Sequence, residues 1–184
     1  MTLVIVGAAG NIGRRLMTAF PGSVGIDRHI DADIVADLAT ADYDSVELRL
    51  ALESATGLVH VATDARPNAP AEIHFATVTA ASRLVEACLR YRVPRLVLPS
   101  SGWADPKPGY GPINPYGHSK RVFEAMAAMY VAAGLHAKAL RFGWVPRDPR
   151  EVEAAPPELR ADYWNDTRLI AEVKAALGFR PDSQ

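Results

Sequence analysis

The sequence predicts an α/β fold in which a doubly wound parallel β-sheet carries helices on both faces. Short, continuous apolar runs alternate along the chain with longer segments whose apolar residues recur at helical spacing. The first run, residues 2–6 (TLVIV), is rich in β-branched residues and leads directly into a glycine-rich turn. Such a continuous apolar run is typical of a strand that is buried on both faces. Strands that alternate with helices throughout favour right-handed βαβ units.

The remaining elements are predicted in the same alternating order. Further strands are expected at residues 23–26, 34–35, 57–61, 95–98 and 138–142. Helices are expected at residues 12–20, 43–52, 71–91, 119–133 and 166–177. The Pro-rich stretch 146–157 is the one segment expected to be irregular. Because neither a repeat nor a linker divides the chain, we expect a single domain over residues 1–184.

Composition excludes several classes of protein and site. The formal net charge of −1 over 184 residues provides no basic field for nucleic acid or for an anionic membrane. Cys88 is the only cysteine, which excludes an intrachain disulfide and a multi-cysteine metal site, and the histidines show no metal-ligand spacing. The sequence shows neither a secretory signal nor an apolar run long enough to span a membrane, so we expect a cytoplasmic protein.

The glycine-rich turn, residues 7–13 (GAAGNIG), predicts a phosphate-binding site. A tight turn after a buried strand needs glycine, and so does a backbone that approaches a pyrophosphate closely. A further glycine lets the following helix pack against the strand, and the helix N-terminus then offers free N–H groups to the phosphates. Since the turn follows the first strand directly, it favours a dinucleotide site over a plain loop.

Two acidic residues are candidates for the nucleoside end of that dinucleotide. Asp27 ends the second strand at the spacing where a carboxylate binds the adenosine ribose hydroxyls. A carboxylate there repels a 2′-phosphate, which favours NAD over NADP, although the neighbouring Arg28 weakens the preference. Asp37 follows the third strand and fits either a place near the adenine or a capping role.

A second motif, residues 116–120 (YGHSK), predicts acid–base chemistry. Residues four apart lie on one face of a helix, so Tyr116 and Lys120 point the same way. We expect the cation to favour the phenolate and to lower the pKa of Tyr116 toward the working pH. Ser100 and Ser101 follow the strand at 95–98, at the carboxyl edge of the sheet where α/β folds bind ligands.

These motifs together resemble the extended short-chain dehydrogenase/reductases of the NAD-dependent epimerase/dehydratase family, and most closely the uronate dehydrogenases. The resemblance implies a Rossmann-like fold, NAD as the cofactor, and Ser101, Tyr116 and Lys120 as the catalytic residues. It further implies a cofactor site formed by Gly7, Gly10, Asn11, Ile12, Gly13, Asp27, Asp37, Leu38, Val61, Ala62, Tyr116, Lys120 and the backbone at Phe142.

The sequence also departs from the family pattern. Val6 stands where a threonine is usual, Thr77 where an asparagine is usual, and Ala65 where uronate dehydrogenases carry a substrate-binding serine. Segment 146–184 is expected to be an abbreviated substrate-side segment, because the family's last strand and small substrate lobe have no counterpart. The substrate half of the site therefore matches the family less closely than the cofactor half.

Three functions remain open from the sequence. The first is an NAD(P)-dependent oxidoreductase that acts on a small hydroxyl or carbonyl substrate, such as a sugar or sugar acid. The second is a catalytically silent NAD(H)-binding sensor or partner subunit. The third is a nucleotide-sugar epimerase or dehydratase. By the same resemblance, the helices at 71–91 and 119–133 pair across a two-fold axis, so a homodimer is expected.

Some residues have simpler interpretations. His60 lies within an apolar strand, where a hydrogen-bonded core histidine is more common than a ligand. Trp103 and Trp144 each follow a strand at the ligand-binding edge and fit pocket lining and local packing equally well.

Overall fold

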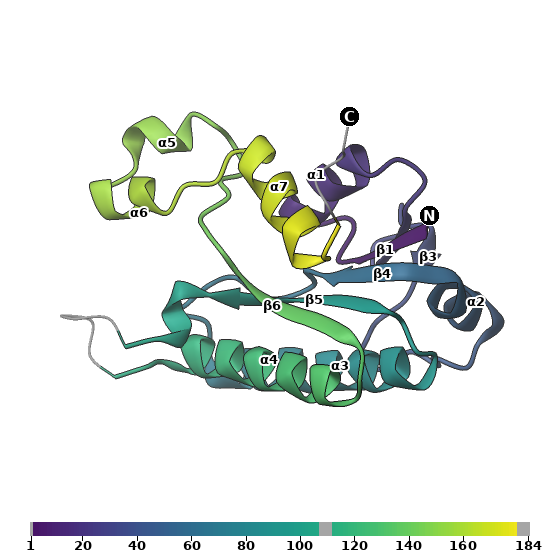
Figure 1. Ribbon diagram of the computed structural model, residues 1–184. Coiled ribbons are helices and arrows are strands. Elements are labelled where there is room, and N and C mark those ends of the chain that lie inside the picture. The colour runs from purple at the N-terminus through teal and green to yellow at the C-terminus, as the bar shows by residue number, and fades with distance from the viewer. Residues whose placement is uncertain (1, 107–111, 180–184) are drawn as a thin grey trace.

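A parallel sheet forms the centre of the protein, in a computed structural model that describes residues 2–106 and 112–179 (Figure 1). The strand order is β3-β2-β1-β4-β5-β6, and every pairing is parallel. The strands are β1 (Thr2–Val6), β2 (Val24–Asp27), β3 (Ile34–Val35), β4 (Ala55–His60), β5 (Arg95–Ser101) and β6 (His136–Phe142). The predicted doubly wound parallel sheet is confirmed.

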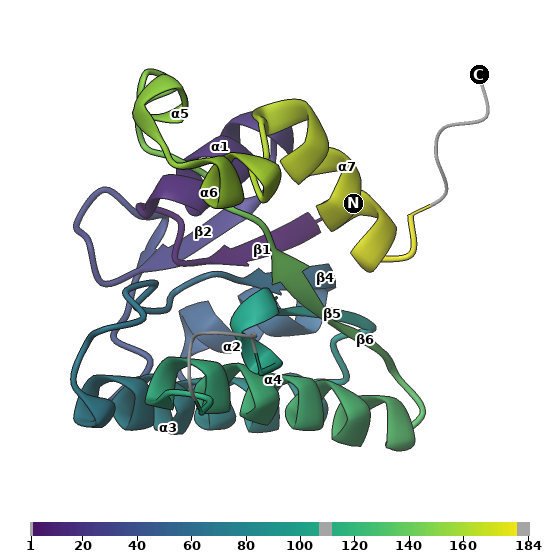
Figure 2. The same ribbon diagram turned by 90° about the vertical axis from the view of Figure 1, so that its left-hand side faces the viewer.

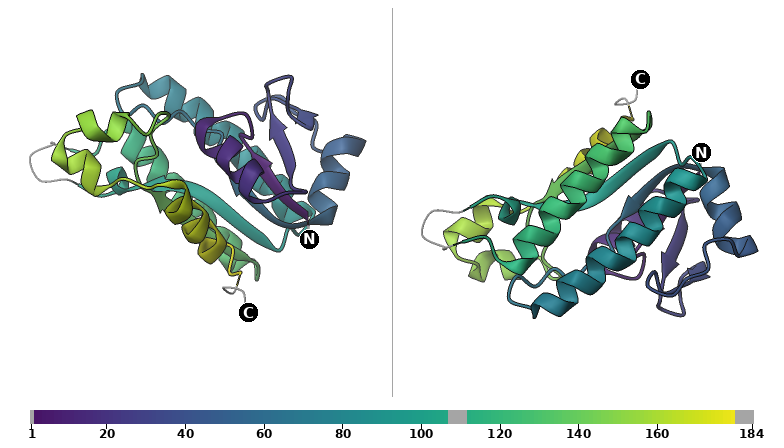
Figure 3. Two further views of the ribbon diagram at one scale, coloured as in Figure 1. Left: turned by 90° about the horizontal axis from the view of Figure 1, so that it is seen from above. Right: turned by 90° about the horizontal axis from the view of Figure 1, so that it is seen from below.

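Helices cover both faces of this sheet. One face carries α1 (Asn11–Ala19) and α7 (Asp166–Ala176), and the other carries α2 (Val46–Ser54), α3 (Ala71–Arg90) and α4 (Pro115–Ala132). Seen from below, α3 and α4 run side by side along the sheet (Figure 3). The short helices η1 (Gly102–Ala104), α5 (Glu151–Ala154) and α6 (Pro157–Ala161) follow β5 and β6.

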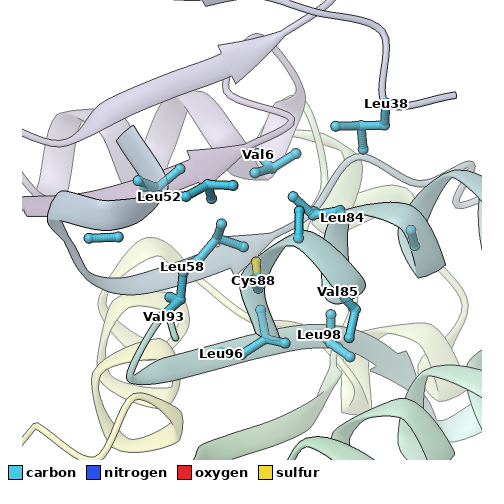
Figure 4. Packing of buried hydrophobic residues seen from close by; sticks show 14 of the residues in the cluster. Val6, Leu38, Leu52, Leu58, Leu84, Val85, Cys88, Val93, Leu96 and Leu98 are labelled. Carbon is cyan, nitrogen blue, oxygen red and sulfur yellow. The ribbon is translucent and has the colours of Figure 1, made fainter. Parts of the chain in front are cut away.

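Each face of the sheet has its own apolar core. Between the sheet and the α2–α3–α4 layer, Leu58 and Leu96 pack against Leu84 and the thiol of Cys88 (Figure 4). On the α1–α7 side, Ile5 and Val59 pack with Leu16 and Leu169. All of these side chains are fully buried. Because successive residues of a strand face opposite sides, strands enclosed in this way read as continuous apolar runs.

Several predicted boundaries were wrong for identifiable reasons. The helix expected at 43–52 begins only at Val46, because Asp42 accepts hydrogen bonds from the backbone N–H groups of Asp44 and Ser45 and forms a turn there. The helix expected at 119–133 begins one turn earlier, at Pro115, where the Asn114 side chain caps it.

Other boundaries differ by less. The strand expected at 95–98 continues to Ser101, since its last residues pair with β6. The strand expected at 57–61 spans 55–60. The stretch 146–157, expected to be irregular, contains the short helix α5.

The strand order determines where a ligand can bind. The chain moves from β1 outward to β2 and β3, and then returns past β1 to β4, so β1 and β4 are neighbours whose following segments diverge. Open α/β sheets bind ligands at this switch point, beyond the carboxyl ends of the strands. Figure 2 faces this edge and shows α5 and α6 on the same side of the sheet as α1 and α7.

Candidate active site

The glycine turn, residues 7–13, lies at the switch point between β1 and β4. Gly7 adopts a φ of +93°, and a Cβ atom on it would lie 2.6 Å from the backbone nitrogen of Ala62. A Cβ atom on Gly13 would lie 2.0 Å from the carbonyl oxygen of Gly7. Side chains at these two positions would therefore collide with backbone, which leaves glycine as the only residue that fits.

The turn presents donors that suit a phosphate group. No side chain caps α1, whose N-cap residue is Gly10. The first N–H groups of a helix have no partner within the helix, and they carry the positive end of the helix dipole. The close approach of Val61 and Ala62 to Gly7 brings the start of the β4 loop against the same turn. This backbone cradle fits a dinucleotide pyrophosphate.

Asp27 lies beside the glycine turn at the end of β2. Its Oδ2 atom accepts a hydrogen bond of 3.0 Å from the backbone N–H of Ala9, and its Oδ1 atom accepts one of 3.0 Å from that of His29. The carboxylate thus holds the turn and keeps further lone pairs that can accept hydrogen bonds. Asp37 accepts from the backbone N–H of Ala39 and caps a local turn, and Leu38 is buried in the apolar core.

Asn11 and Ile12 begin α1, and the Asn11 side chain contacts the segment that follows β6. Its amide donates a 2.8 Å hydrogen bond to the carbonyl of Val145, and Arg15 donates another of 2.8 Å to the carbonyl of Pro146. Arg15 also pairs with Asp166 at the start of α7. The first two turns of α1 therefore hold the segment that follows β6.

A second group of side chains, which we term the tyrosine cluster, consists of Ser101, Tyr116 and Lys120. Ser101 ends β5, and the other two lie on the first turns of α4. All three are buried, Lys120 to an exposed fraction of 2%. The Lys120 Nζ atom lies 4.7 Å from the centre of the Tyr116 ring and donates to the Thr63 hydroxyl at 3.5 Å.

Burial determines the proton affinities in the tyrosine cluster. It raises the pKa of Tyr116, and a hydrogen bond with Ser101 only partly opposes this effect. Burial also lowers the pKa of Lys120 to about 8, against a smaller opposing effect from Asp64. The expectation that Tyr116 has a lowered pKa was therefore wrong for the protein alone, because loss of hydration outweighs the neighbouring groups.

Gly117, the second residue of the YGHSK motif, has a packing role that the motif did not predict. A Cβ atom on it would lie 2.2 Å from the carbonyl oxygen of Trp103 and 2.6 Å from the Cγ2 atom of Ile113. The glycine thus allows α4 to begin directly against η1. This contact places Tyr116 next to the end of β5.

Two buried histidines adjoin the tyrosine cluster. His60, at the end of β4, packs 5.9 Å from the Phe123 ring between ring centres, and His74, on the first turn of α3, packs edge-on at 5.5 Å from the Tyr116 ring. Within the described residues, neither ring nitrogen of His60 has a hydrogen-bond partner, and neither has Nε2 of His74. The prediction of a hydrogen-bonded His60 was wrong. No motif pointed to His74.

The segment after β6 closes on itself at the same edge. Phe142 pairs in register with Ser101, and Gly143 lies under the Trp164 indole, where a Cβ atom would be 2.3 Å from the ring. Trp144 bridges to Tyr163, with the ring centres 6.2 Å apart. Trp144 therefore takes part in local packing.

Neither a metal-binding cluster nor a membrane-spanning helix is found in the described part of the chain. Within residues 2–106 and 112–179, no group of three or more His, Cys, Asp or Glu side chains could hold a metal ion. No helix in the same residues is long and apolar enough to cross a bilayer.

Known proteins resemble this chain in sequence and in fold. Residues 3–145 match the profile of the NAD dependent epimerase/dehydratase family. No curated protein sequence gives a significant match. Among solved structures, the UDP-glucose 4-epimerase of Thermus thermophilus in complex with NAD is 24% identical, with a TM-score of 0.61, and covers 81% of this chain. The likeness to that protein concerns the fold.

Two further structures show somewhat higher identity. The UDP-glucose 4-epimerase of Brucella ovis in complex with NAD is 27% identical, with a TM-score of 0.62 over 76% of this chain. MoeE5, in complex with UDP-glucuronic acid and NAD, is 29% identical, with a TM-score of 0.64 over 79% of this chain. The matches span 58%, 51% and 56% of the Thermus, Brucella and MoeE5 chains, so this chain corresponds to little more than half of each.

Proposed function

We infer the function from the family to which this chain belongs, the NAD dependent epimerase/dehydratase family. We propose that the protein is an NAD-dependent oxidoreductase that uses Ser101, Tyr116 and Lys120. The observation that carries the proposal is the position of the tyrosine cluster. The cluster is buried at the carboxyl edge of the same sheet whose switch point holds the glycine turn.

The tyrosine cluster suits proton transfer to and from a substrate hydroxyl. Tyr116 takes the hydroxyl proton, and Ser101 donates a hydrogen bond that holds the substrate oxygen. The Lys120 Nζ atom lies 4.7 Å from the centre of the Tyr116 ring, and the protonated ammonium group stabilises the negative charge of the phenolate. A bound nicotinamide supplies the hydride acceptor. Its positive charge in the oxidised form would act with Lys120 to offset the raised pKa of Tyr116.

The cofactor site of the proposal follows the sequence prediction. Backbone of the glycine turn holds the pyrophosphate, with Gly7, Gly10 and Gly13 as the essential residues. Asp27 binds the adenosine ribose and selects NAD over NADP through repulsion of a 2′-phosphate. The walls beside the adenine and the nicotinamide are formed by Leu38, Val61, Ala62 and Phe142.

The substrate in this proposal is a sugar or sugar acid with a free secondary hydroxyl or lactol. MoeE5 is in complex with UDP-glucuronic acid, and the similar Brucella ovis structure is a UDP-glucose 4-epimerase. Those similarities favour a nucleotide-sugar epimerase or dehydratase as the second candidate. The two candidates differ in net redox change: an oxidoreductase accumulates NADH, whereas an epimerase regenerates its NAD in every cycle.

The test is a screen of NADH formation at 340 nm with NAD against uronic acids, aldoses and UDP-sugars. Sugar-epimer products are measured in parallel by NMR. We expect NADH formation with a free sugar or sugar acid, lost in Tyr116→Phe while NAD binding by calorimetry is retained. Tyr91→Phe, which alters a partly buried tyrosine hydrogen-bonded to Asp44 after α3, serves as the matched control. Epimer without NADH would support the second candidate. Tight NAD binding without any turnover would favour a silent binding subunit.

We further propose that two copies pair through α3 and α4. Val122 and Met129, two turns apart on one stripe of α4, are 39% and 69% exposed, and Phe75 on α3 is 74% exposed. Exposed apolar side chains on two neighbouring helices favour burial against a partner. Met129→Glu should convert a dimer into a monomer in light scattering. Val46→Glu, at a 63% exposed position on α2, should not. A wild-type protein that is monomeric at high concentration would contradict the proposal.

A further inference from the structure

His74 carries a buried polar atom that packing alone does not explain. The side chain is 2% exposed, and its Nε2 atom has no hydrogen-bond partner among the described residues. A buried donor or acceptor that stays unpaired destabilises the folded protein. A leucine or phenylalanine would fill the same space without that cost, so the imidazole has a polar role.

The neighbours of His74 indicate what this role concerns. Its ring meets the Tyr116 ring edge-on at a distance of 5.5 Å and an interplanar angle of 66°. Both residues lie on first turns, of α3 and α4 respectively, and these two helices pack against each other. The positive ends of two helix dipoles therefore converge on the pair, which favours negative charge on a phenolate.

The charged groups around the pair come from two further directions. Lys120 lies one turn along α4, with its Nζ atom 4.7 Å from the centre of the Tyr116 ring. From the loop after β4, Asp64 is near enough that His74 lowers its pKa, but the carboxylate already forms an ion pair with Arg66. Among the described residues no hydrogen bond joins Asp64 to Nε2 of His74.

We propose that His74 is a positioning residue for Tyr116: its ring edge fixes the orientation of the phenol, and Nε2–H donates toward the phenolate oxygen, directly or through one water. This inference rests on the proposed role of Tyr116 in proton transfer. A donor in this position stabilises the phenolate without adding a net charge. The proposal requires the neutral tautomer that is protonated at Nε2.

The test is an NMR titration of the Tyr116 phenol, which needs no turnover. The six tyrosines are labelled with ¹³C at Cζ, and the Tyr116→Phe variant assigns the signal. We expect His74→Phe, which keeps the ring and removes the donor, to raise the phenol pKa by about one unit, with and without NAD. His74→Asn restores a donor and should recover at least half of the shift. His29→Phe, which removes an exposed histidine, should cause none.

An unchanged phenol pKa in a folded His74→Phe variant would overturn the proposal, and so would equal shifts in His74→Phe and His74→Asn. If His74→Phe does not fold, ¹⁵N NMR of the wild-type imidazole decides, because an unprotonated Nε2 at pH 8 is incompatible with the donor role. Failure of the proposed oxidoreductase function appears separately, as a lack of turnover in a protein whose phenol titration still responds to His74.

Discussion

The glycine turn and the tyrosine cluster lie at the same edge of the sheet but are built in opposite ways. The turn is made of backbone, and positions 7 and 13 leave no space for even a methyl group. The tyrosine cluster is made of side chains, and buried polar atoms around it lack partners within the described residues. Steric necessity therefore defines the first region, whereas electrostatics defines the second.

Gly13→Ala tests the steric requirement of the glycine turn and should have the largest effect on NAD affinity. The new Cβ atom would lie 2.0 Å from the Gly7 oxygen and 2.8 Å from the Ala8 Cα atom, so α1 must move away from the turn. We expect a loss of NAD affinity of about 100-fold or more, measured by calorimetry, because the helix N-terminus no longer faces the pyrophosphate.

Gly134→Ala separates this clash from conformational strain. Gly134 has a φ of +81° with nothing within 4 Å of an added Cβ atom. It should cost about 1 kcal/mol of stability and leave NAD affinity unchanged. Equal NAD affinities in the two variants would remove the steric argument for the glycine turn.

The electrostatics around the tyrosine cluster can be tested at His60, through the stability of the protein at acid pH. Complete burial lowers its pKa from 6.5 to about 3, and Lys120 adds to this effect, so the folded protein keeps it neutral while the unfolded chain becomes protonated. The unfolded state thus binds more protons below pH 6.5, and stability falls as the pH drops from 6.5 toward 3. In urea titrations, His60→Phe should lose less stability than the wild type between pH 6.5 and 4, by on the order of 2 kcal/mol.

The matched control is His29→Phe, whose histidine is exposed, and it should follow the wild-type curve. Parallel curves for His60→Phe and the wild type would mean that His60 is solvated in the folded protein. That result would also weaken the contrast drawn between the two regions.

The same electrostatics can be tested at Lys120, through the stability of the protein at alkaline pH. Because its folded pKa of about 8 lies below the unfolded value, the unfolded chain holds a proton that the folded chain has released between about pH 8 and 10. Stability therefore rises across this range. Lys120→Met should abolish the rise and add on the order of 1–3 kcal/mol at pH 7, with loss of turnover. A variant less stable than the wild type at pH 7 would show that favourable interactions of the Lys120 ammonium group outweigh the cost of burying its charge.

The difference between the two regions also explains which features the sequence could predict. The strands were predictable because enclosed strands read as continuous apolar runs, as in residues 2–6. Gly7 and Gly13 were predictable because a steric requirement has one solution. The direction of the Tyr116 pKa shift was not predictable, since it depends on how deeply α4 buries the phenol.

Tertiary contacts account for the remaining failures. His74 lies 42 positions before Tyr116 in the chain, and nothing in its local sequence indicates that α3 brings the two rings together. The side-chain amide of Asn11 holds the carbonyl of Val145, a contact between segments 134 residues apart that no motif predicted. Spacing within one motif cannot reveal such pairs, because they arise only when separate βαβ units pack.

Asp27→Asn should have the smallest effect and joins the two regions, because here a side chain supports the backbone turn. The single amide oxygen can still accept from either Ala9 or His29, so one of the two hydrogen bonds is kept. Loss of the charge weakens binding of the ribose hydroxyls and removes repulsion of a 2′-phosphate. We expect NAD affinity to fall by about 3- to 10-fold while NADP affinity rises or holds, measured by calorimetry with both cofactors. A parallel loss for both cofactors would mean that Asp27 acts only through the turn, and the preference for NAD would then need another source, such as the neighbouring loop.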